Sequence, residues 1–175
     1  MSARNIILVG PMGSGKSTIG QLLAHRLHKD FYDSDYYIEE KTGVDIPCIF
    51  DVEGEDGFRN RETRAIRELT ELDNVVLATG GGSVMREENR KILRSAGFIV
   101  FLDTSVDQQL DRLRHDKKRP LLKTENPRER LENLLAERKP LYIELADLRV
   151  PTDRKFARKL ASEIVHHLPE YLTRK

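Results

Sequence analysis

The chain has 175 residues, which is enough for one domain with a sizeable buried core. Its 30 lysine and arginine residues nearly balance its 29 aspartate and glutamate residues, so the net charge of +1 provides no long-range field for nucleic acid or an anionic membrane. A single cysteine excludes an intramolecular disulfide, and every apolar run is too short to span a bilayer. Because residues 1–5 contain no signal-peptide pattern, we predict a soluble, cytoplasmic protein that forms one domain over residues 1–175.

The first predicted elements enclose a phosphate-binding motif. Residues 5–10 are a short apolar run typical of a buried strand, and residues 16–28 have the spacing of an amphipathic helix. A complete match to G-x-x-x-x-G-K-[ST] joins them and consists of Gly10, Pro11, Met12, Gly13, Ser14, Gly15, Lys16, Ser17 and Thr18. Its glycines let backbone N–H groups approach a phosphate at the start of the helix, Lys16 adds positive charge, and Ser17 offers a hydroxyl to Mg²⁺. This context favours a nucleoside triphosphate site over a simple glycine-rich turn.

Two carboxylates follow the second predicted strand. The elements expected next are a strand at 31–33 and helices at 36–41, 46–52 and 58–72, with a turn at 54–57. Asp33 and Asp35 are two residues apart and share a face of an extended chain. Beside a phosphate site, Asp33 suits Mg²⁺, held directly or through water, and Asp35 suits a substrate hydroxyl whose proton it accepts. The alternative is a turn, or an N-cap at Asp35 for the following helix.

An arginine and a glutamate open the helix at 58–72. Arg59 and Glu62 are three residues apart and lie on one helix face, where the carboxylate can hold the guanidinium still. A fixed guanidinium binds a carboxylate or a phosphate in bidentate fashion. Without further context, an ordinary ion pair on the helix surface is the favoured explanation of this spacing.

The second half of the chain continues the alternation of strands and helices. We predict strands at 75–79, 98–102 and 148–150 and helices at 87–96, 106–113, 127–145 and 155–168. Five short apolar strands separated by helices indicate a parallel sheet covered on both faces, with ligands at the carboxyl ends of the strands. The phosphate motif, the aspartates and Gly80-Gly81-Gly82 each follow one of the first three strands, so we expect them at one edge of the sheet.

Three glycines and a basic segment complete the candidate site. Gly80-Gly81-Gly82 indicates close approach of the backbone to a ligand, although a plain loop is the alternative. The preceding strand lacks the terminal aspartate of motor and switch NTPases, which leaves the carboxylate role to Asp33. The basic segment at 112–126 is either a lid that closes over a triphosphate or a solvated loop. Arg138, late in a helix, is most simply a surface residue.

Together these motifs resemble those of the shikimate kinases, small P-loop kinases of aromatic amino-acid biosynthesis. The segments that carry the resemblance are 10–18, 33–35, 57–62, 79–82, 119–122 and 137–142, and they extend over nearly the whole chain. The resemblance implies a three-layer α/β sandwich of the nucleoside-monophosphate-kinase type, with strand order 2-3-1-4-5. It also implies transfer of the γ-phosphoryl group of ATP to the 3-hydroxyl of shikimate, with 33–62 as the substrate-binding segment and 112–126 as the lid.

The resemblance further implies the roles of individual residues. The implied catalytic residues are Lys16, Asp35 and Arg119. The implied ATP-binding residues are Gly13, Ser14, Gly15, Lys16, Ser17, Thr18, Arg112, Arg119 and Lys155, with Arg154 as a rival to Lys155 for the contact with adenine. The implied shikimate-binding residues are Asp35, Arg59, Gly81 and Arg138. Mg²⁺ would be held by Ser17 and, through water, by Asp33.

Two other hypotheses remain at this point. Gluconokinases and nucleoside monophosphate kinases share the phosphate loop and the lid, and a non-catalytic ATP-binding module would share the loop. The residues alone lead to a kinase that acts on a small anionic polyol, and the set Arg59, Arg138 and 80–82 distinguishes shikimate kinase from the others. We expect a monomer that binds ATP, Mg²⁺ and shikimate and has no nucleic-acid or membrane partner.

Overall fold

The computed structural model describes residues 4–114 and 124–173. Arg119 and the middle of the expected lid lie outside these ranges. The strands are β1 (Asn5–Val9), β2 (Asp30–Asp33), β3 (Val75–Ala78), β4 (Gly97–Asp103) and β5 (Leu148–Pro151). The helices are α1 (Lys16–Leu27), α2 (Ser34–Thr42), α3 (Ile46–Thr70), the 3₁₀ turn η1 (Ser83–Met85), α4 (Glu87–Ala96), α5 (Val106–Leu113), α6 (Pro127–Leu145), α7 (Ala157–His167) and α8 (Glu170–Thr173).

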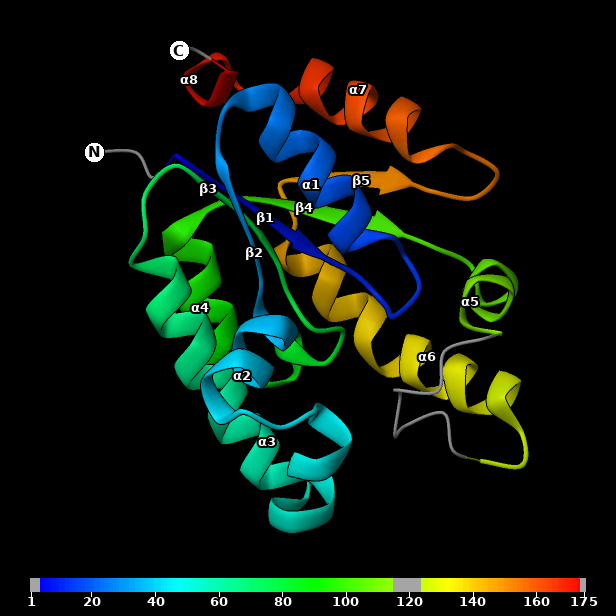
Figure 1. Ribbon diagram of the computed structural model, residues 1–175. Coiled ribbons are helices and arrows are strands. Elements are labelled where there is room, and N and C mark those ends of the chain that lie inside the picture. Colours follow the sequence, from blue (N-terminus) through cyan, green and yellow to red (C-terminus); the bar gives the residue numbers. More distant parts are fainter. Residues whose placement is uncertain (1–3, 115–123, 174–175) are drawn as a thin grey trace.

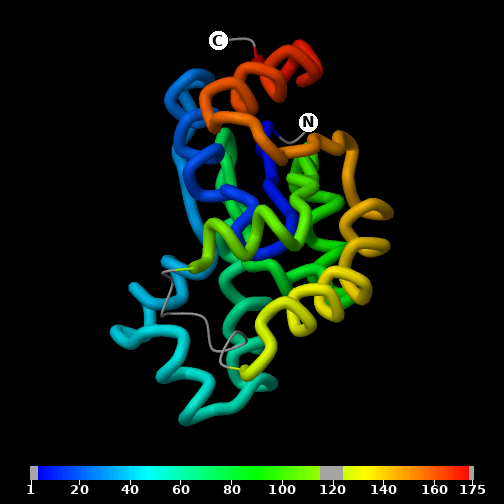
Figure 2. Tube along the Cα trace, turned by 90° about the vertical axis from the view of Figure 1, so that its right-hand side faces the viewer, coloured from blue at the N-terminus to red at the C-terminus, as the bar shows by residue number. Residues whose placement is uncertain are grey.

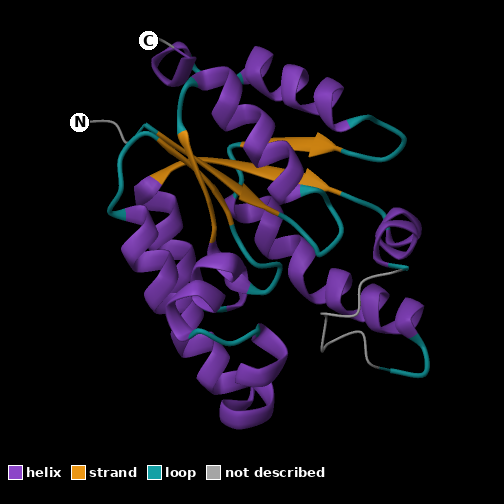
Figure 3. Ribbon diagram, viewed as in Figure 1, coloured by secondary structure: helices purple, strands orange, loops and turns teal. Residues whose placement is uncertain are grey.

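The strands form one sheet in the order β2-β3-β1-β4-β5, and every neighbouring pair is parallel. Strand β1 is central, with Ile7 opposite Leu77 on β3 and opposite Ile99 on β4. Figure 3 shows the strands between layers of helices. The predicted α/β fold and strand order are therefore confirmed.

The alternation of side chains along β1 divides the core between the two faces of the sheet. Ile6 and Leu8 are fully buried on one face, where they pack with residues of α1 and α7. Ile7 and Val9 are fully buried on the other face, where they pack with residues of α3, α4 and α6. Figure 1 shows these two groups of helices on opposite sides of the sheet. A strand buried on both faces is predominantly apolar, which is why residues 6–9 are all apolar and the run at 5–9 contains no charge.

A third apolar cluster connects the phosphate loop with helices from the second half of the chain. Met12, in the loop, packs with Leu131 and Leu134 of α6, and partly buried residues of α5 cover them. Helices α5 and α6 lie against each other in Figures 1 and 2. The loop is thus supported by helices other than the one that follows it.

The helix boundaries differ from the predictions at a few places. The expected helices at 46–52 and 58–72 are joined as α3, but Gly54 has φ 70° and ψ −176°, so the helical conformation is interrupted there. The predicted turn is therefore restricted to Gly54, and Gly57 lies within a helical turn. Helix α7 begins at Ala157 rather than at 155, and η1 and α8 were not predicted. Within residues 4–114 and 124–173, no helix is both long and apolar enough to cross a bilayer.

We expect Gly20→Ala to destabilise the fold, although alanine favours a helix by about 1 kcal/mol over glycine. A Cβ at Gly20 would lie 2.5 Å from Cε2 of Phe31, because α1 packs closely on β2. Overpacking of this kind costs about 1–3 kcal/mol, so the free energy of unfolding in urea should fall by about 1 kcal/mol. The exposed neighbour Gln21→Ala is the control and should change it by less than about 0.5 kcal/mol. A more stable Gly20→Ala protein would contradict the packing argument.

Candidate active site

The carboxyl ends of β1, β2 and β3 surround one cavity of about 250 Å³. Its lining residues come from the phosphate loop, the start of α2, the segment after β3 and the end of α5, and they are Gly13, Gly15, Lys16, Ser17, Thr18, Asp33, Asp35, Thr79, Gly80, Gly81, Arg112 and Leu113. The predicted convergence of three motifs at one edge of the sheet is confirmed, as expected for ligand sites in parallel sheets.

The phosphate loop is already shaped to receive an anion. Gly13 and Gly15 have φ values of 77° and 90°, which residues with a Cβ rarely adopt. The Nζ of Lys16 donates hydrogen bonds to the carbonyl oxygens of Gly10 (2.7 Å) and Pro11 (2.9 Å), which holds the side chain over the loop. No acidic residue occupies the first turn of α1, so nothing in that turn competes with a ligand for its N-terminal N–H groups.

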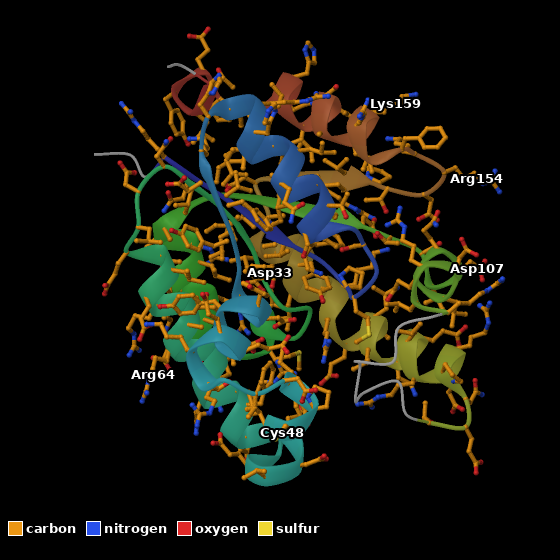
Figure 4. All side chains as sticks on the ribbon, viewed as in Figure 1. Asp33, Cys48, Arg64, Asp107, Arg154 and Lys159 are labelled. Atoms are coloured by element: carbon orange, nitrogen blue, oxygen red, sulfur yellow. The ribbon has the colours of Figure 1, made fainter. Side chains whose placement is uncertain are left out.

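Asp33 uses its two carboxylate oxygens for different contacts. One oxygen accepts hydrogen bonds from the backbone N–H groups of Asp35 (2.9 Å) and Tyr36 (3.2 Å), so Asp33 is the N-cap of α2. The suggestion that Asp35 has this role is therefore wrong, because the helix begins at Ser34, two residues earlier than predicted. The other oxygen accepts a hydrogen bond from the hydroxyl of Ser17. Figure 4 shows Asp33 near the middle of the molecule, beside α2.

The pair of Ser17 and Asp33 fits Mg²⁺ better than a metal that needs several protein ligands. A hydroxyl and a carboxylate in contact at the edge of an open cavity are oxygen ligands of the type that Mg²⁺ prefers, and this ion keeps most of its waters. Among the described residues, no group of three or more histidine, cysteine, aspartate or glutamate side chains could enclose a metal.

Two of the three glycines after β3, Gly80 and Gly82, are required by the charged side chains around them. A Cβ at Gly80 would lie 2.8 Å from Oε2 of Glu62 and 2.9 Å from Oδ1 of Asp35. At Gly82 it would lie 2.4 Å from Nη2 of Arg59. The segment is therefore not a plain loop, because its backbone is in direct contact with the groups predicted to bind a substrate.

Both predicted arginines are buried, in contrast to the surface positions that local sequence suggested. Arg59 is 8% exposed and Arg138 is 5% exposed, although each lies on a helix. Arg59 pairs with Glu62 at 2.8 Å and with the exposed Glu55 at 3.5 Å. Neither arginine lines the cavity itself, but both lie next to the glycine segment. Nη1 of Arg138 is 3.7 Å from the position that a Cβ at Gly81 would take.

Burial shifts the pKa values of Arg59 and Glu62. Burial raises the pKa of Glu62, and the guanidinium of Arg59 opposes this shift only in part. Burial alone would lower the pKa of Arg59, but Glu62 keeps it above its usual value. The Nε of Arg138 is buried and has no hydrogen-bond partner among the residues that the structure describes. The N–H group at Nε of Arg138 can therefore donate a hydrogen bond to an incoming anion, which is a strong acceptor.

Of the residues predicted to contact the nucleotide, Arg112 lies at the cavity, whereas Arg154 and Lys155 do not. Nη1 of Arg112 donates to the carbonyl oxygen of Gly13 at 2.9 Å, so this arginine lies over the phosphate loop. Neither Arg154 nor Lys155 lines the cavity. Nζ of Lys155 pairs with Glu163 at 2.9 Å, and Figure 4 shows Arg154 at the end of the loop after β5, on the same side of the molecule as α5. The choice between them as the adenine contact stays a prediction.

Two buried hydroxyls in the site were not assigned a role from the sequence. Oγ of Ser34 accepts a hydrogen bond from the N–H of Gly80 at 3.1 Å, and Oη of Tyr142 donates to the carbonyl oxygen of Gly81 at 2.5 Å. Ser34 lies between the two aspartates, and Tyr142 follows Arg138 by four residues on α6. That spacing places the arginine and the tyrosine on one helix face and was the available signal.

Comparisons with known proteins agree with this geometry. A sequence profile of the shikimate kinase family matches residues 12–169. The chain is 56% identical to a shikimate kinase of Vibrio cholerae, over 97% of both chains, and 58% identical to one of Vibrio vulnificus, over 95% of this chain and 97% of that one. The structure of a shikimate kinase from Acinetobacter baumannii in complex with shikimate superposes with a TM-score of 0.92 at 49% identity, over 95% of this chain and 92% of that one.

A gluconokinase from Sinorhizobium meliloti is a more distant neighbour. It superposes with a TM-score of 0.55 at 17% identity, over 96% of this chain and 94% of that one. This similarity shows a shared fold alone.

We expect Asp33→Ala to lower the free energy of unfolding by about 1 kcal/mol, because it removes the cap of α2. Asp33→Asn keeps an oxygen that can accept the same N–H groups, so its stability should stay within about 0.5 kcal/mol of the unchanged protein. Urea unfolding of both variants checks the expectation. Equal losses in the two variants would show that the charge, rather than the cap, stabilises this end of the sheet.

Proposed function

Since this chain belongs to the shikimate kinase family, we propose that it transfers the γ-phosphoryl group of ATP to the 3-hydroxyl of shikimate. The products are shikimate 3-phosphate and ADP, and the reaction serves aromatic amino-acid biosynthesis. The observation that carries the proposal is the position of two buried guanidiniums, those of Arg59 and Arg138, beside the glycine segment that borders the phosphate loop. If the arginines bind the carboxylate of shikimate, the hydroxyls on its ring would point toward the terminal phosphate in the phosphate loop.

The proposed nucleotide half consists of the phosphate loop and the groups beside it. Residues Gly13 to Thr18 bind the phosphates through backbone N–H groups, and Lys16 stabilises the charge that develops on the transferred group. Ser17 and, through water, Asp33 would hold Mg²⁺, which would supply positive charge that neutralises the phosphates. Arg112 contacts the nucleotide, and Lys155 or Arg154 contacts adenine.

The proposed binding site for the acid is separated from the phosphate loop by the glycine segment at 80–82. Arg59 and Arg138 bind the carboxylate, because a planar guanidinium matches its two oxygens. Asp35 orients the reacting hydroxyl and accepts its proton, and it lines the cavity with Lys16. Gly81 contributes backbone contacts. The protein thus contributes position and charge, which is most of what phosphoryl transfer requires.

The remaining assignments belong to the same proposal. Arg119, outside the described residues, provides a cation for the transferring phosphoryl group from a lid at 112–126, and residues 33–62 form the acid-binding segment. The whole chain of 1–175 acts as one domain, as a cytoplasmic monomer without nucleic-acid or membrane partners. Gluconokinase, nucleoside monophosphate kinase and a non-catalytic ATP module are not favoured, because the relatives at 56–58% identity are shikimate kinases.

A panel of acceptors tests the function directly. We expect release of ADP from Mg²⁺-ATP in the presence of shikimate and only background release with gluconate or nucleoside monophosphates. Lys16→Ala is the control for contaminating ATPases, because it should abolish the signal. Faster ADP release with gluconate than with shikimate would contradict the proposal, and ATP binding without stimulation by any acceptor would favour the non-catalytic module.

We expect Gly82→Ala to impair binding of the acid without unfolding the protein. The backbone at Gly82 (φ −92°, ψ 1°) accepts alanine, but its methyl group would displace the guanidinium of Arg59, which Glu62 holds in place. With an overpacking cost of about 1–3 kcal/mol, the KM for shikimate should rise at least about fivefold while the KM for ATP stays nearly unchanged.

Ser83→Ala is the matched control for this substitution. It places a methyl side chain at the next position and removes a buried hydroxyl that has no hydrogen-bond partner among the described residues. Its steady-state constants should match those of the unchanged enzyme. A normal KM for shikimate in Gly82→Ala would show that Arg59 does not bind the acid.

A further inference from the structure

The three glycines between the two halves of the site have no side chains to hold them in place. Successive glycines have more conformational freedom than any other residues, so a defined backbone here depends on outside anchors. One anchor is Ser34 on the side of α2, which accepts the N–H of Gly80. A second side-chain anchor comes from α6, where Oη of Tyr142 donates to the carbonyl oxygen of Gly81 at 2.5 Å. Because a peptide group is planar, holding that oxygen also fixes the direction of the N–H of Gly82.

Tyr142 is itself held rigidly. Its side chain is fully buried, and its ring stacks on Phe101 of β4 with 5.1 Å between centroids and an interplanar angle of 27°. The ring therefore belongs to the core beneath the sheet, while the hydroxyl reaches the glycine segment. The packing on β4 therefore determines where the hydroxyl of Tyr142 lies, and the hydroxyl in turn holds the backbone of Gly81.

The same phenol also contacts one of the two arginines. The guanidinium of Arg138, one helical turn earlier on α6, interacts with the hydroxyl of Tyr142. The position of a Cβ at Gly81 would be 3.3 Å from the backbone N of Met12 and 3.7 Å from Nη1 of Arg138. Gly81 therefore lies between the phosphate loop and the guanidinium, and the phenol contacts both the glycine and the arginine.

We propose that Tyr142 is a positioning residue whose hydroxyl fixes the carbonyl of Gly81 and the guanidinium of Arg138 relative to each other, so that the acid binds in the correct orientation. This inference rests on the proposed function, because it assumes that Arg138 binds the carboxylate. Tyr142 touches no reacting atom and acts through its two neighbours.

The protonation state of the phenol supports this role. Burial raises the pKa of Tyr142 far above its usual value, and the nearby guanidinium of Arg138 opposes the shift only partly. The hydroxyl therefore keeps its proton at neutral pH and remains a hydrogen-bond donor.

Tyr142→Phe tests the inference, because it keeps the ring on Phe101 and removes only the hydroxyl. Loss of a hydrogen bond to a buried carbonyl should raise the KM and the Kd for shikimate about tenfold, with the KM for ATP and kcat changed less than about twofold. Unchanged values for shikimate would overturn the inference. A parallel rise in both KM values, or failure of the variant to fold, would also overturn it, because the hydroxyl would then serve general stability.

Ile164→Ala is the control for lost stability, since this residue is buried in α7 on the far face of the sheet. It should lower the melting temperature and leave the KM for shikimate unchanged. A double-mutant cycle of Tyr142→Phe with Arg138→Lys should be non-additive for the shikimate Kd if the phenol acts through the guanidinium. Strict additivity would overturn that link.

Calorimetry without ATP separates this inference from the proposed function. An unchanged protein that binds shikimate but transfers no phosphoryl group would contradict the function, while the comparison of Kd values would still test Tyr142. An unchanged protein that does not bind shikimate would overturn both.

Discussion

The site depends on the burial of the Arg59 guanidinium against a backbone without side chains. Removing a guanidinium and a carboxylate from water costs several kcal/mol for each ion unless their geometry is very good. The 2.8 Å pair between Arg59 and Glu62 offsets part of this cost, and Gly82 provides the space that any Cβ would fill. Buried ion pairs add little net stability, so this one is better understood as holding a cation rigid beside the cavity.

The parallel sheet brings the other components to that cation. Because the carboxyl ends of parallel strands meet at one edge, the loops after β1, β2 and β3 converge although they are far apart in the sequence. Helix α6 approaches the same edge from the second half of the chain and contributes Arg138 and Tyr142. Asp33 serves the fold and the site together, with one oxygen capping α2 and the other contacting Ser17.

Much of this could be predicted from the sequence, because its strongest signals are local. The short apolar runs predicted all five strands to within one residue at each end. The phosphate motif is specified by residue types and spacing alone. Burial of Arg59 and Arg138 could not be predicted, because a helical arginine appears exposed until the packing partners are known. The alternative of a cap at Asp35 differed from the observed cap at Asp33 because helix ends are uncertain by a residue or two. The contact between Tyr142 and Gly81 joins residues 61 positions apart, which no local pattern reveals.

The crowding around residues 80–82 also limits how such a protein can change its acceptor. Side chains at Gly80 and Gly82 would collide with Glu62 or Arg59, so new specificity cannot arise by adding groups to this segment. Diversification must instead begin on α2, α3 or α6, where the charged side chains themselves originate. An evolutionary path to a different acid would therefore alter the cations first and leave the glycines for last.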